Sequence, residues 1–212
     1  MRDPYVRTDE ATEFDKAEAV KAEIVDRASE LFSHYGFWKT NIGDIAECCG
    51  MSPGNLYRYF RNKQAIGLAV ISCYFQMVQT AFETVEMLPG GTAEERVRKW
   101  LEAGVTQAIA QVANHPKIVE LAEFLMEDED GLKLLQSHID WKREHLAREI
   151  RKGMDDGSLE PGDAVQTAAT LLTALKVFWM PTTLAKWRDK ETILPELRAI
   201  LDLFFRGLRA RS

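Results

Sequence analysis

The chain has 212 residues and a formal net charge of −6 at pH 7, with 46% hydrophobic and 28% charged residues. This is the composition of an ordinary soluble globular protein with ample core, and its acidity argues against a broadly basic DNA-packaging protein. The chain contains no run of about eighteen apolar residues and no charged-then-apolar leader, so we expect a cytoplasmic protein that does not engage a membrane. Its three cysteines, two of them adjacent, cannot form a disulfide framework.

The N-terminal region is predicted to contain an arm followed by a helix. Residues 1–15 carry many charges and show no apolar period, which predicts a flexible arm. Apolar residues recur at helical spacing from Lys16 to Tyr35, and Gly36 is placed to end the helix. This buried face would contain Val20, Ile24, Ala28, Leu31 and Phe32. The helix should cover the next segment, because two short helices alone bury too little surface to fold.

Residues 40–63 have the pattern of two short helices joined by a tight corner. Thr40 can cap the first helix, and Gly50 can take the left-handed conformation that closes its last turn. Ser52 followed by Pro53 is a helix start signal, which predicts a second helix over about 53–60. The residues predicted to be buried here are Ile42, Ile45, Ala46, Cys49, Leu56 and Phe60. The pattern predicts a helix-turn-helix.

The second of these helices keeps a polar face that suits the major groove of DNA. Asn55 can pair with adenine, and the absence of a side chain at Gly54 lets the backbone approach the duplex. Between Met51 and Ala65 the charged residues are all basic, so this window carries +3 and the rest of the chain −9. The residues predicted to contact DNA are Thr40, Asn41, Ser52, Pro53, Gly54, Asn55, Tyr57, Arg58, Tyr59 and Lys63.

The same stretch resembles the signature of TetR-family transcriptional regulators. The resemblance runs from near 21 to 69, and two positions depart from the family pattern: Asn55 stands where many members carry Thr, and Pro53 where a basic residue is common. It rests on Ile45-Ala46, Gly50-Met51-Ser52, Gly54-Asn55-Leu56-Tyr57, Tyr59-Phe60 and Lys63, with Ala28, Leu31, Phe32 and Tyr35-Gly36-Phe37 before them. It implies a DNA-binding domain followed by a helical domain that binds a small effector and forms a dimer.

The rest of the chain is predicted to be helical and to hold an aromatic pocket. Lys63 begins a long helix that is apolar on two sides, and a capping-box pattern at Thr92 and Glu95 opens the next. A helix over about 132–152 also faces two ways. The predicted effector-binding residues are Phe75, Phe82, Trp100, Phe124, Met126, His138, Trp141 and His145. Their character favours a small, largely apolar or aromatic effector.

The last two predicted helices have wide apolar faces. Asp163 caps a helix that Pro181 ends, and Pro195 opens the final helix. These faces form either the end of the monomer core or a dimer interface, which the resemblance favours. The predicted interface residues are Val165, Ala169, Leu172, Trp179, Leu197, Ile200, Leu201, Phe204 and Leu208. Two-fold symmetry would place two recognition helices in successive major grooves and predicts a palindromic operator.

We therefore expect an all-α fold of about nine helices, with an arm at 1–15, a three-helix DNA-binding domain at 16–62 and an effector-binding and dimerisation domain at 63–212. The predicted function is a ligand-responsive regulator, most simply a repressor that binds double-stranded DNA as a homodimer. No catalytic motif or cofactor site is evident. One alternative is a metal-binding or enzymatic helical protein that uses His138 and His145. Another is a DNA-binding protein that responds to no ligand.

Overall fold

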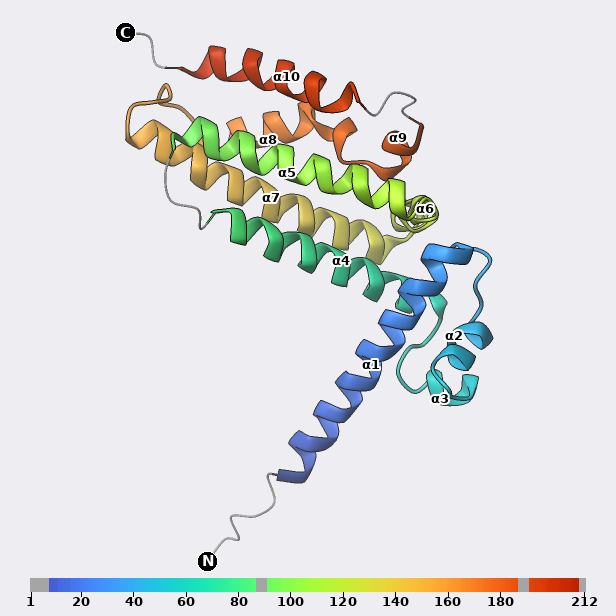
Figure 1. The fold of residues 1–212 in the computed structure, drawn as a ribbon. Helices are drawn as coiled ribbons and strands as arrows, with labels where there is room; N and C mark the ends of the chain where they lie inside the picture. The colour runs from blue at the N-terminus through green and yellow to red at the C-terminus, as the bar shows by residue number, and fades with distance from the viewer. Residues whose placement is uncertain (1–7, 87–90, 187–190, 210–212) are drawn as a thin grey trace, which may run out of the picture. The chain divides into compact units, whose positions relative to one another are not determined.

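The computed structural model describes residues 8–86, 91–186 and 191–209, and their regular structure is helical apart from one isolated bridge between Leu159 and Arg209 (Figure 1). Within these ranges ten α-helices and one 3-10 helix form. They are α1 Thr8–Tyr35, α2 Ile42–Cys48, α3 Pro53–Leu56, α4 Lys63–Glu86, α5 Ala93–Asn114, α6 Ile118–Glu127, α7 Glu129–Asp155, α8 Ala164–Ala174, η1 Lys176–Phe178, α9 Pro181–Lys186 and α10 Ile193–Leu208. The chain divides into two compact units between Cys73 and Tyr74, inside α4.

Helix boundaries differ from expectation at both ends of the chain. Helix α1 begins at Thr8, so residues 8–15 of the predicted arm are helical, while residues 1–7 lie outside the described part. Pro181 begins α9 instead of following a long helix, because the helix after Asp163 ends at Ala174 and gives way to the 3-10 helix η1. Helix α10 begins at Ile193, and Pro195 falls in its first turn, where a missing N–H costs nothing.

In the first unit, α1 packs against α2 and α2 against α3. An aromatic contact near the end of α1 stabilises this arrangement, because the rings of Phe32 and Phe37 meet edge to face with centroids 5.2 Å apart. The chain can turn sharply at Gly36 and Gly50 because both have positive φ, of 96° and 64°. The buried apolar residues of this unit are Ile24, Ala28, Phe32, Phe37, Ile45, Ala46, Leu56, Ile66, Val70 and Ile71. The predicted three-helix arrangement is confirmed.

In the second unit, α7 is the central helix and packs against α5, α6 and α8 (Figure 1). Thr92 and Glu95 form the predicted capping box of α5, with the Thr92 Oγ1 accepting from the Glu95 N–H at 3.2 Å. Gly153 lets α7 approach its neighbours, because a Cβ there would lie 2.7 Å from the Ala93 Cβ. The core therefore depends on close helix contacts as well as on large apolar side chains.

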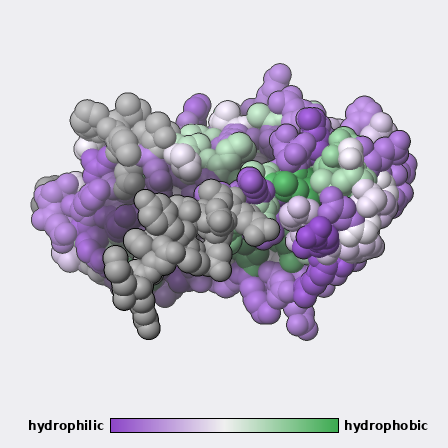
Figure 2. Space-filling view, turned by 90° about the horizontal axis from the view of Figure 1, so that it is seen from below, coloured by the Kyte–Doolittle hydropathy of each residue, from purple (hydrophilic) through white to green (hydrophobic). Residues whose placement is uncertain are grey.

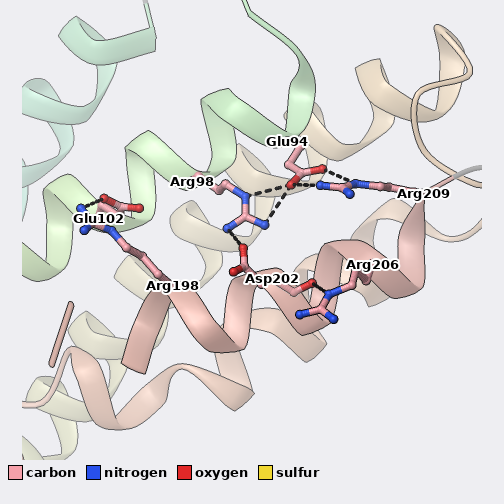
Figure 3. Close-up of polar contacts among 7 residues, drawn as sticks. All are labelled: Glu94, Arg98, Glu102, Arg198, Asp202, Arg206 and Arg209. Carbon is pink, nitrogen blue, oxygen red and sulfur yellow. Dashed lines mark hydrogen bonds and ion pairs between the residues drawn. The ribbon is translucent and has the colours of Figure 1, made fainter. Parts of the chain in front are cut away.

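Helix α10 is fastened to α5 by a row of ion pairs (Figure 3). Glu94 accepts hydrogen bonds from Arg209 at 3.0 and 2.9 Å and pairs with Arg98, which also pairs with Asp202 at 2.8 Å. The Arg209 guanidinium, and then Arg98, hold the pKa of Glu94 below its usual range. Arg209 and Asp202 are more than half exposed, so their pairs add little stability singly, whereas the Glu94–Arg98 pair within α5 is largely buried.

The face of the protein shown in Figure 2 is mostly hydrophilic, whereas the long helix α4 is apolar. Hydrophilic residues make up most of the face shown in Figure 2, with hydrophobic residues in smaller patches. By length and composition alone, α4 could cross a membrane over Lys63–Glu83. However, Ile66 and Val70 are buried in the first unit, and Val78 and Phe82 in the second. Part of the apolar surface of α4 therefore belongs to the cores of the two units.

Candidate DNA interface and effector site

The first helix of the helix-turn-helix is capped by Asn41 and not by Thr40 as predicted. The Asn41 Oδ1 accepts from the Asp44 N–H at 3.1 Å, and the Asp44 carboxylate accepts from the Asn41 N–H at 2.8 Å. Thr40 is only 2% exposed, and its hydroxyl donates to the Gly36 carbonyl at 2.8 Å. The structure therefore corrects the capping prediction, and a buried, engaged hydroxyl does not support the predicted DNA contact of Thr40.

The corner and the second helix follow the predicted signals. The Met51 N–H donates to the Ala46 carbonyl at 2.9 Å across the corner, and the Ser52 Oγ accepts from the Asn55 N–H at 3.2 Å. Regular α-helix ends at Leu56, earlier than predicted, but the Tyr59 and Phe60 N–H groups both donate to the Leu56 carbonyl. The recognition segment therefore continues as tight turns to the predicted end.

Most of the predicted DNA contacts are available to solvent around α3. Leu56 is fully buried and anchors the helix, while Asn55 and Tyr59 are half-buried. The exposed members of the predicted set are Asn41, Ser52, Pro53, Gly54, Tyr57 and Arg58. Trp38 and Lys39, which the sequence analysis did not single out, are also exposed, in the turn before α2. No periodicity marks them, because they lie between helices.

Lys63, which is predicted to contact DNA phosphate, makes hydrogen bonds within the first unit. Its ammonium group donates to the carbonyls of Phe37 at 2.8 Å and Thr40 at 2.9 Å, and lies 4.5 Å from the centroid of the Phe37 ring. These carbonyls belong to the turn between α1 and α2. Lys63 therefore ties the start of α4 to the segment that orients the helix-turn-helix.

Replacing Lys63 with methionine should destabilise the first unit by about 1–3 kcal/mol, because two carbonyls in a packed turn lose their charged donor. DNA affinity should fall for all sequences, while the slope of log affinity against log salt should stay nearly unchanged. Thermal unfolding and salt titrations of DNA binding would measure both. A slope that falls by about one unit, as after loss of a phosphate contact, would restore the original assignment.

Six of the eight predicted effector-binding residues come together in the second unit. Together with Trp179 they form what we call the aromatic cluster: Phe75, Phe82, Trp100, His138, Trp141, His145 and Trp179. Its centre is Trp100, whose ring centroid lies 4.4 Å from that of Phe82, 5.2 Å from His145 and 6.2 Å from both Trp141 and Trp179. The other two predicted residues lie on α6, where Phe124 is buried and Met126 is exposed.

Three polar atoms of the aromatic cluster are buried without a hydrogen-bond partner. They are the Nε1 atoms of Trp100 and Trp179 and the Nδ1 atom of His138. Trp100 is 4% exposed and His138 6% exposed, so both side chains are shielded from bulk solvent. Burial, and then the nearby charge of Lys142, lower the pKa of His138 to about 3, so its imidazole is neutral at physiological pH.

Lys142 brings a positive charge to the edge of the aromatic cluster. Its ammonium nitrogen lies 4.2 Å from the centroid of the Trp179 ring. Burial lowers its pKa to about 8. Within the described ranges Lys142 has neither an ion pair nor a side-chain hydrogen bond. A cation that has no counter-anion among the described residues therefore lies beside the aromatic cluster.

Sequence reasoning missed Lys142 and gave Trp179 a different role, as an interface residue. A signal for Lys142 was present, because it follows His138 by four residues and precedes His145 by three on one helix face. No such signal existed for Trp179, which reaches Trp100 through the fold. The Trp179 ring can pack here because residue 104 is glycine. A Cβ at Gly104 would lie 2.3 Å from the Trp179 Cζ3 and 2.4 Å from the Phe82 Cζ.

The two histidines of the alternative metal site are engaged with aromatic rings. His138 stacks on Phe75 with centroids 4.0 Å apart, and His145 stacks on Trp100. The His145 Nδ1 lies 3.1 Å from a nitrogen of Arg148. Among the residues that the structure describes, no three His, Cys, Asp or Glu side chains gather into a possible metal site. Both imidazoles are therefore part of the aromatic cluster.

The predicted dimer interface requires correction at two positions. Leu197 and Leu201 are 0% exposed in the core of the second unit, so neither can meet a partner chain. Of the other predicted interface residues on α8 and α10, Val165 is exposed. The half-buried ones are Ala169, Leu172, Ile200, Phe204 and Leu208. An open groove between these helices is lined by Asp163, Gln166, Thr167, Thr170, Phe204 and Leu208. The remaining predicted interface residues on α8 and α10 therefore lie on the outward faces of these helices.

Comparison with known proteins agrees with this geometry. Residues 24–70 match the family described as bacterial regulatory proteins, tetR family, and residues 93–200 match the tetracyclin repressor-like C-terminal domain. The chain is 25% identical over 159 residues to the HTH-type transcriptional regulator YfiR of Bacillus subtilis, an alignment that covers 71% of this chain and 72% of YfiR. It is 32% identical over 84 residues to YerO of the same organism, covering 39% of this chain and only 29% of YerO.

A solved TetR-family regulator from Pectobacterium atrosepticum has the same fold, with a TM-score of 0.71 at 20% identity over 93% of this chain and 98% of that one. The helix-turn-helix and the helical second unit together define a DNA-binding transcriptional regulator, not an enzyme. The chain belongs to the TetR family.

Proposed function

We propose that this regulator is a cytoplasmic repressor that binds a palindromic operator as a homodimer and is released by a small, largely apolar or aromatic effector. The observation that carries the proposal is the aromatic cluster, where buried polar atoms lack partners that a bound molecule would supply. The exposed polar residues around α3 and the local basic charge support the proposed binding of DNA by the helix-turn-helix.

We expect a dimer because the DNA-binding end of a single chain is small. Specific protein–DNA interfaces bury roughly 1,000–2,500 Å² of protein, more than the four-residue α3 and its neighbours supply alone. Two copies with recognition segments about 34–36 Å apart would meet successive major grooves. The half-buried apolar residues on α8 and α10 supply a surface for this pairing.

Effector response requires that the aromatic cluster and the DNA-binding end be coupled. Helix α4 belongs to both units and carries Phe75 and Phe82 of the cluster. A coupling free energy of about 1–3 kcal/mol would change DNA affinity roughly 5- to 150-fold, which is enough to switch transcription.

The proposal is tested by comparing the binding of the purified protein to the DNA upstream of its own gene and to a random fragment of equal length, at about 150 mM salt. We expect the upstream fragment to bind at least about 10³-fold more tightly, with two protein chains per site. A small molecule retained during purification, identified by mass spectrometry, should lower that affinity when added back. Equal affinities for the two fragments would refute the regulator, and a one-chain complex would refute the dimer.

Asn55→Ala should relax the preference of the protein at one base pair per half-site, at a cost of roughly 1–3 kcal/mol for the preferred sequence. The reason is that a half-buried amide in the first turn of the recognition segment can read a base edge. Arg58→Ala is the matched control, because an exposed arginine that holds phosphate should weaken all sequences alike. Binding to a library of single-base operator variants separates the two. Equal loss on operator and random DNA after Asn55→Ala would contradict base reading.

A further inference from the structure

Most of the polar groups without a partner in or beside the aromatic cluster are hydrogen-bond donors. An indole N–H only donates, and so does a lysine ammonium. The Trp100 and Trp179 Nε1 atoms and the Lys142 ammonium thus share one need, a hydrogen-bond acceptor. The neutral His138 can use its unpaired Nδ1 either way, according to its tautomer.

The charge of Lys142 narrows the chemical class of the effector further. Lys142 has no carboxylate partner within the described ranges, and its charge contributes to the lowered pKa of His138, four residues earlier on the same helix. A cation held against aromatic rings away from bulk water favours an anion beside it. A neutral acceptor would satisfy the indoles and leave the charge uncompensated, while a cationic ligand would be repelled.

We propose that the effector is a flat organic anion, an aromatic carboxylate whose ring joins the aromatic cluster and whose carboxylate accepts from Lys142 and from the indole N–H groups of Trp100 and Trp179. This inference rests on the proposed function, because it assigns the chemical class of the effector at that site. The ring of Trp141, which is half-buried, supplies the stacking surface.

The arrangement of the cluster gives such a ligand a side of entry. Phe82, Trp100, His138 and His145 are buried and form its inner wall. Phe75, Trp141, Lys142 and Trp179 are half-buried and form its outer side. Trp179 follows the 3-10 helix η1 and precedes α9, so no continuous α-helix holds its backbone. Rotation of this ring off its seat on Gly104 would open space beside Trp100 and Lys142.

The test compares two probes of nearly equal shape, 2-naphthoate and its neutral analogue 2-naphthamide. Their dissociation constants for the full-length protein are measured by calorimetry and by quenching of tryptophan fluorescence. The wild-type protein should bind 2-naphthoate at least about tenfold more tightly than the amide, because a buried charge-assisted contact is worth about a factor of ten or more. Bound 2-naphthoate should also weaken operator binding.

Two variants assign the preference to named groups. Lys142→Met keeps the length of the side chain and should reduce the preference for the anion to less than about threefold, because no cation remains. Trp100→Phe removes the indole N–H and keeps an aromatic ring, and should weaken 2-naphthoate about five- to tenfold. Lys133→Met is the matched control on the same helix, where the lysine is exposed and paired with Asp130, and should change neither constant.

Each outcome has a definite meaning for the inference. A wild-type protein that binds both probes equally, or neither at 1 mM, overturns the anion receptor; so does a preference that survives in Lys142→Met. Those results leave the proposed regulator standing if operator binding stays specific and another molecule releases it. Loss of operator specificity, by contrast, refutes the proposed function whatever the probes do.

Discussion

Phe205→Ala should lower the free energy of unfolding by about 3–5 kcal/mol, the range for deleting a fully buried phenylalanine side chain. Phe205 fills the core of the second unit under α10, and its ring lies 5.1 Å from the Arg98 guanidinium carbon. The cavity would lie beneath the α5–α10 ion pairs shown in Figure 3, so surface pairing cannot compensate. Denaturant unfolding with a common slope measures the loss.

The neighbouring residue provides the matched control. Phe204 is half-buried and borders the open groove between α8 and α10, so Phe204→Ala should cost the folded chain much less. If this face pairs two copies, Phe204→Ala should instead raise the dimer dissociation constant, which sedimentation at micromolar concentrations would detect. Equal destabilisation by the two variants, with no change in association, would place Phe204 in the core and remove it from the proposed interface.

Lys142→Met should raise the free energy of unfolding at pH 7 by about 2 kcal/mol, because the wild-type fold holds a cation in a poorly solvated site. The pKa of Lys142 falls from 10.5 to about 8 in the folded protein. Between these values the unfolded chain binds more protons than the folded one, so this group makes the wild-type protein more stable as pH rises. The advantage of Lys142→Met should therefore be largest below pH 8 and shrink toward pH 10.5.

Unfolding of both proteins at several pH values between about 7 and 10 would test this sign. Lys133→Met serves again as control, since Asp130 raises the pKa of that exposed lysine, and no gain in stability is expected. A difference between wild type and Lys142→Met that does not change with pH would mean that the ammonium group is well solvated. In that case its place in the proposed effector site would also be lost.

Features that depend on a few neighbouring residues could be read from the sequence. The Thr92–Glu95 capping box, the Ser52–Pro53 start and the Gly50 corner are all local hydrogen-bonding or backbone choices, and all three form. The helix-turn-helix follows from them. Even so, Thr40 and Asn41 are both good capping residues, and only the fold chose between them, by burying Thr40 against Gly36.

Contacts between distant segments could not be read in this way. The sequence predicted one wide apolar face on α10, but whether a residue on it lies in the core or faces outward depends on where α5 packs; Leu201 is buried and Leu203 is 67% exposed. Likewise, helical spacing brought His138, Trp141 and His145 together in advance. Their union with Phe82, Trp100 and Trp179, and the unpaired charge of Lys142 beside them, required tertiary packing of α4, α5 and α7.

The sequence by itself thus determined the fold class, the DNA-binding motif and the helix face that carries His138, Trp141 and His145, because periodicity and capping act within one or two helical turns. The tertiary structure alone decided that Lys63 ties a turn, that Leu197 and Leu201 belong to the core, and that three polar atoms of the aromatic cluster have no partner. Burial and hydrogen-bond satisfaction are properties of the packed chain, since they depend on residues that are distant in sequence.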